Sequence, residues 1–232
     1  AARHVLAQPA NRGTAVAVLE ALAHTLAYDR DPYLVILPSD QVVEDEAAWR
    51  ATLEHACAAA REYSEELILV AVEPQEDASF GWVLPGEPAD DGTRTVVEFV
   101  EKPAAEQAAR IAARGGLCSA FVFAASARVL LRFYVHHAAE LLGYYEEAIR
   151  CEEARSAERR RAYDRIPACD FSHDILEHAT GEVRVLQGAP CGWMDLGTPA
   201  RLERWIARRC ARTPRGAGRA ARSAQLERRT QR

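Results

Sequence analysis

The chain has 232 residues, of which 49% are hydrophobic and 27% are charged, and its formal net charge is −5. This length allows one large or two small domains, and the composition is typical of a globular protein. No apolar run is long enough to span a bilayer, and the N-terminal residues lack the hydrophobic segment of a signal peptide. We therefore expect no membrane partner and a cytoplasmic location.

The first third of the chain alternates between helix and strand patterns. Apolar residues recur at helical spacing in residues 14–27 and again in residues 47–62. Two short, wholly apolar runs, residues 33–37 and 67–72, have the pattern of strands that are buried on both faces of a parallel sheet. This alternation predicts an α/β layered sheet.

The alternation continues to the end of the second third. Residues 80–84 and 95–100 are predicted strands, with turns at Pro85-Gly86 and at Asp90-Asp91-Gly92. A helix over residues 104–114 should end at Gly115-Gly116. The remaining elements are a strand over 119–124, mostly helical structure over 127–161 and a late strand over 183–186.

Positive charge is concentrated at the C-terminal end. Residues 201–232 contain eleven Arg and two Glu, a net charge of +9, so the other 200 residues carry −14. Residues 212–232 are rich in Arg, Ala, Gly and Ser, which predicts a disordered basic tail after one domain of residues 1–211. No aromatic residues alternate with these arginines, so a solvated tail is expected rather than a nucleic-acid-binding one.

The six cysteines include no CxxC pair and have no regular spacing. This pattern argues against a zinc ribbon or a disulfide scaffold and favours a reducing compartment.

Lys102 is the single lysine among the 29 basic residues, all the others being arginine. Lysine carries a compact charge on a flexible stem, whereas arginine carries a broad planar fork. A phosphate oxygen that is approached end-on in a narrow pocket suits the ammonium group. Lys102, directly after a β-rich run, is therefore a candidate phosphate ligand; the alternative is an ordinary surface lysine.

Two aspartates follow predicted strands. Asp40 closes the segment Leu37-Pro38-Ser39-Asp40, and Asp195 lies in Gly192-Trp193-Met194-Asp195. In open α/β sheets, ligands bind beyond the carboxyl ends of strands, and Mg²⁺ prefers one or two carboxylates together with phosphates and water. Both aspartates are therefore candidate Mg²⁺ ligands. The alternatives are an N-cap for the helix near residue 47 and a turn before Gly197, respectively.

Seven short segments stand in order along the chain: residues 8–15 (QPANRGTA), 37–40 (LPSD), 80–82 (FGW), 99–103 (FVEKP), 117–123 (LCSAFVF), 170–172 (DFS) and 192–197 (GWMDLG). Their order and spacing resemble those of the sugar-1-phosphate nucleotidyltransferases, most closely the mannose-1-phosphate guanylyltransferase-like branch. FVEKP is the most specific match. The resemblance implies a Rossmann-like fold with a mixed, mostly parallel sheet flanked by helices.

The resemblance also implies a reaction, in which a sugar-1-phosphate oxygen attacks the α-phosphorus of a nucleoside triphosphate and pyrophosphate is released. Three residues would be catalytic, with Asp40 and Asp195 binding Mg²⁺ and Lys102 holding the sugar phosphate. The implied substrate-binding residues are Gly81, Glu101 and Ser119. The residues implied near the base are Gln8, Arg12 and Thr14. GTP and mannose-1-phosphate are implied by the branch alone.

The chain departs from the family pattern at several places. The family's first strand and glycine-rich loop, whose backbone N–H groups cradle the triphosphate, have no counterpart in these residues. We therefore expect an N-terminally truncated fold with little or no activity of its own and with unpaired sheet edges that allow homo-oligomers. Gln41 replaces the family histidine after the metal aspartate, and Cys118-Ser119 replaces Trp-Asn.

Two functions from different classes remain open. The first is the body of a sugar-1-phosphate guanylyltransferase-like enzyme, which the retained Asp40, Lys102 and Asp195 favour. The second is a non-catalytic relative that keeps a nucleotide-sugar or sugar-phosphate pocket for binding or regulation, which Ser119 and the missing loop favour. In both cases the expected partners are a nucleotide and a sugar phosphate.

Overall fold

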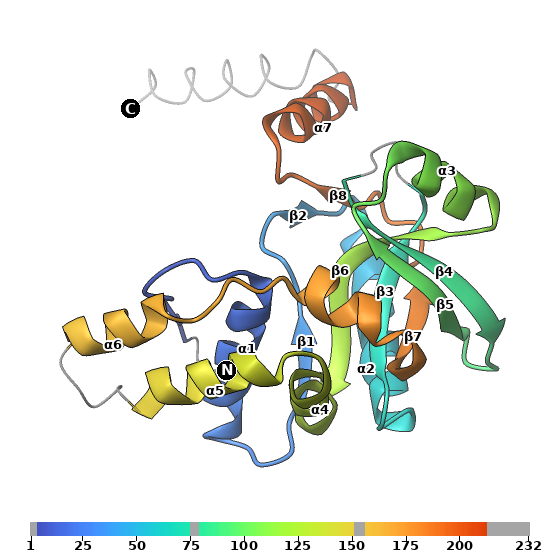
Figure 1. The fold of residues 1–232 in the computed structure, drawn as a ribbon. Coiled ribbons are helices and arrows are strands. Elements are labelled where there is room, and N and C mark those ends of the chain that lie inside the picture. The colour runs from blue at the N-terminus through green and yellow to red at the C-terminus, as the bar shows by residue number, and fades with distance from the viewer. Residues whose placement is uncertain (1–3, 75–78, 151–155, 213–232) are drawn as a thin grey trace, which may run out of the picture. The chain divides into compact units, whose positions relative to one another are not determined.

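The computed structural model describes residues 4–74, 79–150 and 156–212 (Figure 1). Its contacts divide the chain into two compact units. Unit 1 comprises residues 1–38 and 45–191, and unit 2 comprises residues 39–44 and 192–232. The predicted boundary after residue 211 falls at the end of helix α7 (Pro199–Arg212), and the predicted tail beyond that helix lies outside the described residues.

Unit 1 is built on a six-stranded sheet. Its strands are β1 (Tyr33–Ile36), β3 (Leu67–Val72), β4 (Gly81–Pro88), β5 (Thr93–Glu101), β6 (Leu117–Ser126) and β7 (Val183–Gln187). They lie in the order β1-β6-β3-β7-β5-β4, and β4 also pairs with β6. Strand β1 therefore lies at one edge and pairs with β6 only.

The sheet is mixed, as expected. Strands β1 and β3 both run antiparallel to β6, and β3 runs parallel to β7, so β1, β3 and β7 point the same way. Strand β4 shares this direction because it is antiparallel to β6. Direct parallel pairing among the described residues is nevertheless confined to β3 with β7, since the oppositely directed β6 and β5 separate the other strands.

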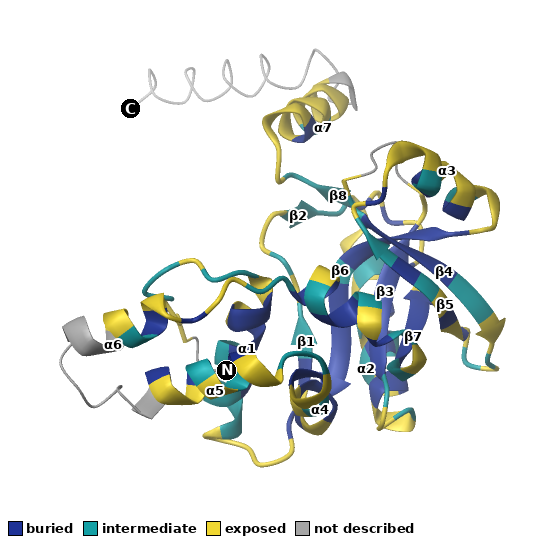
Figure 2. Ribbon diagram, viewed as in Figure 1, coloured by how far each residue is buried: buried dark blue, intermediate teal, exposed yellow. Residues whose placement is uncertain are grey.

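Helices surround this sheet, and some of them pack on other helices rather than on its strands. They are α1 (Thr14–Leu26), α2 (Glu46–Glu62), α3 (Ala105–Ala113), α4 (Ala127–His137), α5 (Ala139–Arg150) and α6 (Ser156–Asp164). Helix α2 contacts β1, β3 and β6. The strands of unit 1 are largely buried, whereas most of these helices have one buried and one exposed face (Figure 2).

Alternation along β3 separates the two faces. All six residues of this strand are buried, but only Leu67, Leu69 and Ala71 belong to the main core cluster. Because successive side chains of a strand point to opposite faces, Ile68 and Val70 face the other layer. The sheet is therefore buried on both sides at its centre, which explains the continuous apolar sequence of β3.

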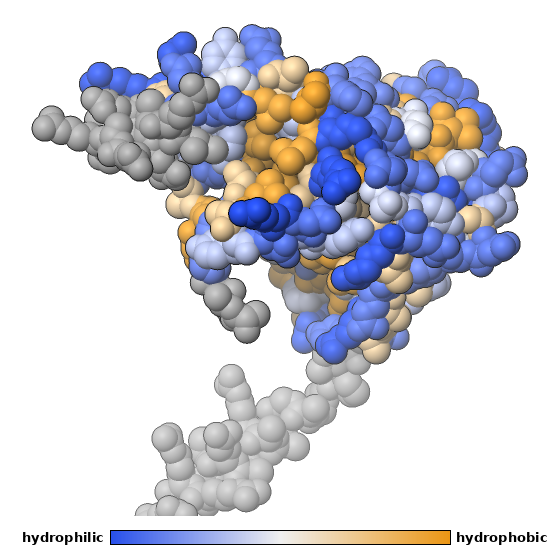
Figure 3. Space-filling view, turned by 90° about the horizontal axis from the view of Figure 1, so that it is seen from below, coloured by the Kyte–Doolittle hydropathy of each residue, from blue (hydrophilic) through white to orange (hydrophobic). Residues whose placement is uncertain are grey.

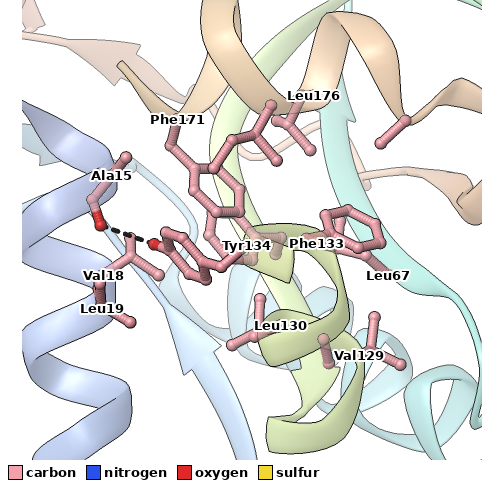
Figure 4. Packing of buried hydrophobic residues seen from close by; sticks show 14 of the residues in the cluster. Ala15, Val18, Leu19, Leu67, Val129, Leu130, Phe133, Tyr134, Phe171 and Leu176 are labelled. Carbon is pink, nitrogen blue, oxygen red and sulfur yellow. Dashed lines mark hydrogen bonds between the residues drawn. The ribbon is translucent and has the colours of Figure 1, made fainter. Parts of the chain in front are cut away.

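The main core lies between the sheet, α1, α4 and a π-helix, η1 (Phe171–Ile175). Phe123 of β6 stacks on Phe171, with ring centroids 4.9 Å apart and planes inclined by 6°. The buried Tyr134 hydroxyl donates a hydrogen bond of 2.6 Å to the Ala15 carbonyl, which links α4 to α1 (Figure 4). The two helices are therefore joined by a buried polar contact as well as by apolar packing.

Short 3₁₀-helices, η2 (Leu176–His178) and η3 (Thr180–Glu182), follow η1 and lead into β7. Apolar side chains also remain exposed, among them Leu131 and Val135 of α4. Figure 3 shows apolar surface gathered in one area between hydrophilic side chains. Exposed apolar side chains of this kind are normal on proteins.

Unit 2 has a two-stranded sheet of β2 (Gln41–Val42) and β8 (Met194–Asp195), followed by α7. Trp193 donates its indole N–H to the Gln41 side chain over 3.0 Å. No helix among the described residues is long and apolar enough to cross a membrane.

Two sequence-based expectations are wrong. Residues 33–37 are not buried on both faces, because β1 is an edge strand, and Tyr33 and Leu37 are exposed. Pro85-Gly86 is not a turn but part of β4, where the register with β5 shifts on either side of Pro85. Pairing along the whole hairpin outweighs the local turn preference of these two residues.

Candidate functional site

The two predicted Mg²⁺ ligands, Asp40 and Asp195, come together in unit 2. Gln41 pairs with Asp195 in the β2–β8 ladder, and the Leu196 N–H donates to the Asp40 carbonyl over 2.7 Å. These backbone bonds hold two segments that are far apart in the sequence side by side. They therefore place both aspartates at one end of a short ladder.

Gly197 shows how closely the two carboxylates converge. A Cβ atom placed on this glycine would lie 3.1 Å from Oδ2 of Asp40 and 3.1 Å from Oδ1 of Asp195. Both carboxylates thus border the same small space, which any other side chain would fill. Two carboxylates around one space are the donor set that Mg²⁺ uses, so the residues fit this ion.

Arg201 of α7 also occupies this site. Its guanidinium contacts Asp195 Oδ1 at 2.5 Å, and the Gly197 N–H donates to the same oxygen over 2.9 Å. Asp195 therefore does act as a turn residue before Gly197, as the alternative interpretation expected. Neither contact involves Asp195 Oδ2, so the carboxylate can hold the turn with one oxygen and present the other to a cation.

The alternative interpretation of Asp40 is wrong. The helix near residue 47 is α2, and its N-cap is Asp45, whose side chain accepts hydrogen bonds from the N–H groups of Ala47 and Ala48. Asp40 lies in the other unit and is exposed. Helix capping therefore does not explain an aspartate at position 40.

The three predicted substrate-binding residues meet in unit 1. Gly81 is paired with Glu101 across β4 and β5. A Cβ on Gly81 would lie 2.7 Å from the Glu101 carboxylate, 2.8 Å from the Phe99 ring and 3.4 Å from Ser119 Cβ. Glycine at position 81 thus lets the Glu101 side chain lie flat against the neighbouring strand.

Ser119 lies at a bulge in β6. In the pairing with β3, Val70 is opposite Val122 while Ala71 is opposite Ser119, so β6 carries the extra residues. Phe121 has a φ of 51° there and donates its N–H to the Ser119 hydroxyl over 3.2 Å. Bulges are frequent beside active sites, where they redirect side chains.

Lys102 follows β5 in an unusual backbone conformation. Its φ is 48°, in the left-handed region that non-glycine residues seldom adopt, and its N–H donates to the Phe80 carbonyl. The ammonium lies 3.3 Å from Glu101 Oε1, with 63% of the lysine side chain exposed against 14% for Glu101. Lys102 therefore has an accessible charge beside a mostly buried carboxylate.

Acidic neighbours surround Glu101. Burial raises the pKa of Glu101 above its ordinary value, the nearby Lys102 opposes this shift, and the charges of Asp170 and Glu177 add to it. The Glu101 N–H also donates to the Glu177 side chain, which in turn lies 3.0 Å from the His173 ring. Sequence reasoning missed Glu177 and His173; their only signal is that they lie within seven residues of the DFS segment.

Thr14, at the start of α1, is tied to the segment that precedes η1. Its hydroxyl donates to Asp170 Oδ2 over 3.2 Å and accepts from the Phe171 N–H over 2.8 Å. Gly13, with φ 91°, makes this close approach possible, because a Cβ there would lie 2.2 Å from the Cys169 carbonyl oxygen. Asp170 therefore contacts Thr14 and also influences Glu101.

Gln8 and Arg12 do not join this cluster. Arg12 donates to the Asp164 carbonyl and side chain over 2.6 and 3.2 Å. Gln8 Nε2 is buried without a hydrogen-bond partner among the described residues. Buried donors are normally paired, so this amide is suited to a ligand group.

An apolar pocket of about 390 Å³ borders Thr14. Val18, Val35, Leu37 and Phe121 contribute to its lining, and neither Gln8 nor Arg12 does. The walls carry no cation for phosphates, so the pocket suits only an apolar or aromatic group.

Comparison with known proteins gives the family. The nucleotidyl transferase family profile matches residues 2–209 of this chain, and the chain belongs to that family. A crystal structure described as mannose-1-phosphate geranyltransferase from Thermus thermophilus superposes with a TM-score of 0.72 at 27% identity, covering 87% of this chain and 57% of that one. The predicted α/β fold, a mixed sheet flanked by helices, is thereby confirmed.

Two curated relatives each match most of this chain. Xanthan biosynthesis protein XanB from Xanthomonas campestris pv. campestris (strain B100) is 30% identical over 206 residues, covering 84% of this chain and 41% of that protein. A putative mannose-1-phosphate guanylyltransferase from Vibrio cholerae is 26% identical over 201 residues, covering 84% and 42%. The chain thus spans about two fifths of the length of these relatives.

Proposed function

We propose that this chain is the body of a sugar-1-phosphate nucleotidyltransferase that transfers GMP from GTP to mannose-1-phosphate or a similar sugar phosphate. A phosphate oxygen of the sugar-1-phosphate forms a bond to the α-phosphorus, the bond to the β-phosphate breaks, and pyrophosphate leaves. Guanine and mannose are chosen because relatives such as the Vibrio cholerae protein are described as mannose-1-phosphate guanylyltransferases.

The observation that carries the proposal is the convergence of Asp40 and Asp195 around Gly197. A protein that only binds a neutral sugar has no need of two adjoining carboxylates. Mg²⁺ held between them would neutralise and orient the phosphates of the triphosphate. Asp195 would use the oxygen that Arg201 and Gly197 leave available, and the exposed Asp40 would supply the second ligand.

Unit 1 would supply the sugar phosphate contacts. The Glu101 carboxylate would accept hydrogen bonds from sugar hydroxyls beside Gly81 and Ser119. Lys102 would leave its contact with Glu101 and bind the phosphate, which offsets the repulsion between two anions that must meet. The buried Gln8 amide would donate to the nucleotide, with Arg12 and Thr14 near it.

A second candidate function is nucleotide-sugar binding without turnover. The observation in its favour is the Arg201–Asp195 ion pair of 2.5 Å, because the guanidinium already neutralises one of the two carboxylates. Serine at position 119 offers one hydroxyl where an asparagine offers an amide donor and acceptor. In this case the ligand would bind equally well with and without Mg²⁺.

Calorimetric titration with GDP-mannose, with and without Mg²⁺, separates the two functions. The enzyme proposal predicts metal-dependent binding in the parent and its loss in Asp195→Asn, with the far-ultraviolet circular dichroism unchanged. Equal affinity in both conditions would favour the binding module. We also expect turnover by this chain alone to stay below the ~1–10³ s⁻¹ usual for enzymes, because its sequence contains no glycine-rich triphosphate loop.

Replacement of Lys102 by Arg tests the phosphate contact. The proposal gives the phosphate a compact ammonium partner, which the broad planar guanidinium replaces poorly, so sugar-phosphate affinity should fall in Lys102→Arg. Arg114→Lys is the matched control, because Arg114 is a similarly exposed residue, 58% accessible, paired with Glu98 at 3.3 Å. Equal affinity of Lys102→Arg and the parent would show that Lys102 is an ordinary surface lysine.

The compartment and the assembly are part of the proposal. We propose a cytoplasmic location, because Cys57, Cys169 and Cys210 are free thiols. Self-association would use the β1 edge of the sheet, whose second side has no strand partner among the described residues.

A further inference from the structure

A second cluster of metal-ligating side chains lies in unit 1 and contains none of the residues proposed above to bind Mg²⁺ or substrate. Among the described residues, His136, His137 and Glu182 form a group whose three ligand atoms all lie within 4.8 Å of one another. The two histidines occupy the last turn of α4, and Glu182 ends η3, directly before β7. The cluster therefore joins the end of a helix to the start of a strand in the sheet.

The geometry leaves one ligand atom without a partner. Glu182 Oε1 lies 3.6 Å from His137 Nε2 and 3.9 Å from His136 Nδ1, both beyond hydrogen-bond distance. His137 Nε2 is buried and has no hydrogen-bond partner among the described residues. Its ring is held edge-on against Phe133, with centroids 6.1 Å apart and planes at 84°. The buried nitrogen therefore lies near an acceptor oxygen without a hydrogen bond to it, and a metal ion could bridge the two atoms.

The surrounding charges favour a cation. Arg132 contacts the other Glu182 oxygen, Oε2, at 2.8 Å and also pairs with Glu65. Arg132 contributes a charge of +1 and its two partners, Glu65 and Glu182, contribute −2, so these three side chains carry a net charge of −1. The carbonyl end of α4 adds the negative pole of the helix dipole.

We propose that His136, His137 and Glu182 bind a divalent transition metal of the zinc type. Two imidazole nitrogens and one carboxylate oxygen are donors that Zn²⁺ accepts. Metal–ligand bonds of about 2.0–2.2 Å place tetrahedral ligands roughly 3.3 Å apart. The distances of 3.6 and 3.9 Å therefore need to shorten by less than an ångström. A water molecule completes the shell on the exposed side of His136.

The metal would have a structural role and would take no part in nucleotidyl transfer. It would fix the end of α4 to the segment that enters β7, and α4 carries Phe133 and Tyr134 of the main core. Because the folded chain holds the three ligands together and the unfolded chain does not, binding stabilises the fold. A hundredfold excess of free metal over its Kd corresponds to about 2.7 kcal/mol.

The test is titration of the full chain with ZnCl₂ and, separately, with CoCl₂, in the presence of excess Mg²⁺ so that carboxylate sites are occupied. We expect one tight equivalent of Zn²⁺, a raised melting temperature and a Co²⁺ spectrum of tetrahedral type without a thiolate charge-transfer band. His136→Gln is the informative variant, since this exposed side chain can change without disturbing the core. It should lose the tight equivalent and the thermal shift.

His173→Gln is the matched control. His173 is also exposed and lies 3.0 Å from a carboxylate, that of Glu177, but it has no second histidine beside it. This variant should bind Zn²⁺ as the parent does. The proposal is overturned if the parent binds no Zn²⁺, if His136→Gln retains the tight equivalent, or if the Co²⁺ spectrum shows thiolate ligands. Glu182→Gln, which also breaks the Arg132 ion pair, should lose binding and in addition lower the metal-free melting temperature.

Discussion

Replacing Gly81 by Ala tests whether the Glu101 carboxylate really rests on the backbone of β4. The new methyl carbon would lie 2.7 Å from Glu101 Oε2 and 2.8 Å from the Phe99 ring, closer than non-bonded atoms approach. Phe99 is buried, so the ring has little room to move, and Glu101 must swing away. The substitution should therefore both destabilise the fold and weaken sugar-phosphate binding.

The expected change in the free energy of unfolding of Gly81→Ala follows from two opposing effects. Overpacking of this kind costs about 1–3 kcal/mol. Alanine also reduces the conformational freedom of the unfolded chain, which stabilises the fold by about 0.4–1 kcal/mol. In a chain of this length, 1 kcal/mol shifts the melting temperature by roughly 2–4 °C. Gly81→Ala should therefore melt several degrees below the parent.

Gly143→Ala is the matched control, because it is the same chemical change at an exposed glycine of α5. A Cβ atom there meets nothing within 4 Å. Alanine in a helix is more favourable than glycine by about 0.5–1 kcal/mol, so this variant should melt slightly above the parent. Differential scanning calorimetry of the three proteins gives the answer. Equal shifts for the two variants would show that Glu101 and Phe99 do not confine position 81.

Two further changes probe the core and the electrostatics of the site. Tyr134→Phe removes the hydrogen bond to the Ala15 carbonyl and should lower the free energy of unfolding by about 0.5–1.5 kcal/mol in urea unfolding; an unchanged midpoint would refute that contact. Folding raises the pKa of Glu101, so its contribution to stability is complete below the ordinary value of 4.5 and is lost as the pH rises through the folded value. Relative to the parent, Glu101→Gln should therefore gain stability between pH 4 and pH 7. A stability difference that stays constant over that range would contradict the raised pKa.

The sheet could largely be predicted because its central strands are continuous apolar runs. Leu67–Val72 is buried at every position, so neither face of this strand needs polar residues. Pro85-Gly86 was misleading for the opposite reason, since both residues favour turns locally while the β4–β5 hairpin keeps them in a strand. Local preferences decide a structure only where long-range pairing does not oppose them.

The candidate site was harder to derive because its parts meet only through pairings that are distant in the sequence. The β2–β8 ladder has two residues on each side, too few for an alternating pattern, yet it brings Asp40 and Asp195 together. The position of each aspartate after a predicted strand made it a candidate Mg²⁺ ligand, and the family resemblance implied the pair. Glu177 could not be predicted, because nothing in the local sequence distinguishes it from any other glutamate. Only the folded chain shows that its carboxylate accepts a hydrogen bond from the Glu101 N–H.

The contacts of Thr14 favour another role than the one that the family resemblance implies. Its hydroxyl already donates to Asp170 and accepts from the Phe171 N–H, so it has little capacity left for a nucleotide base. Asp170 Oδ1 meanwhile accepts from the N–H groups of Ser172 and His173 at the start of η1. Thr14 is therefore better placed to position Asp170, whose charge acts on Glu101, than to contact the base. The unpaired Gln8 amide is the stronger candidate for that contact, and its role stays a prediction that the nucleotide-sugar titration of Gln8→Ala would test.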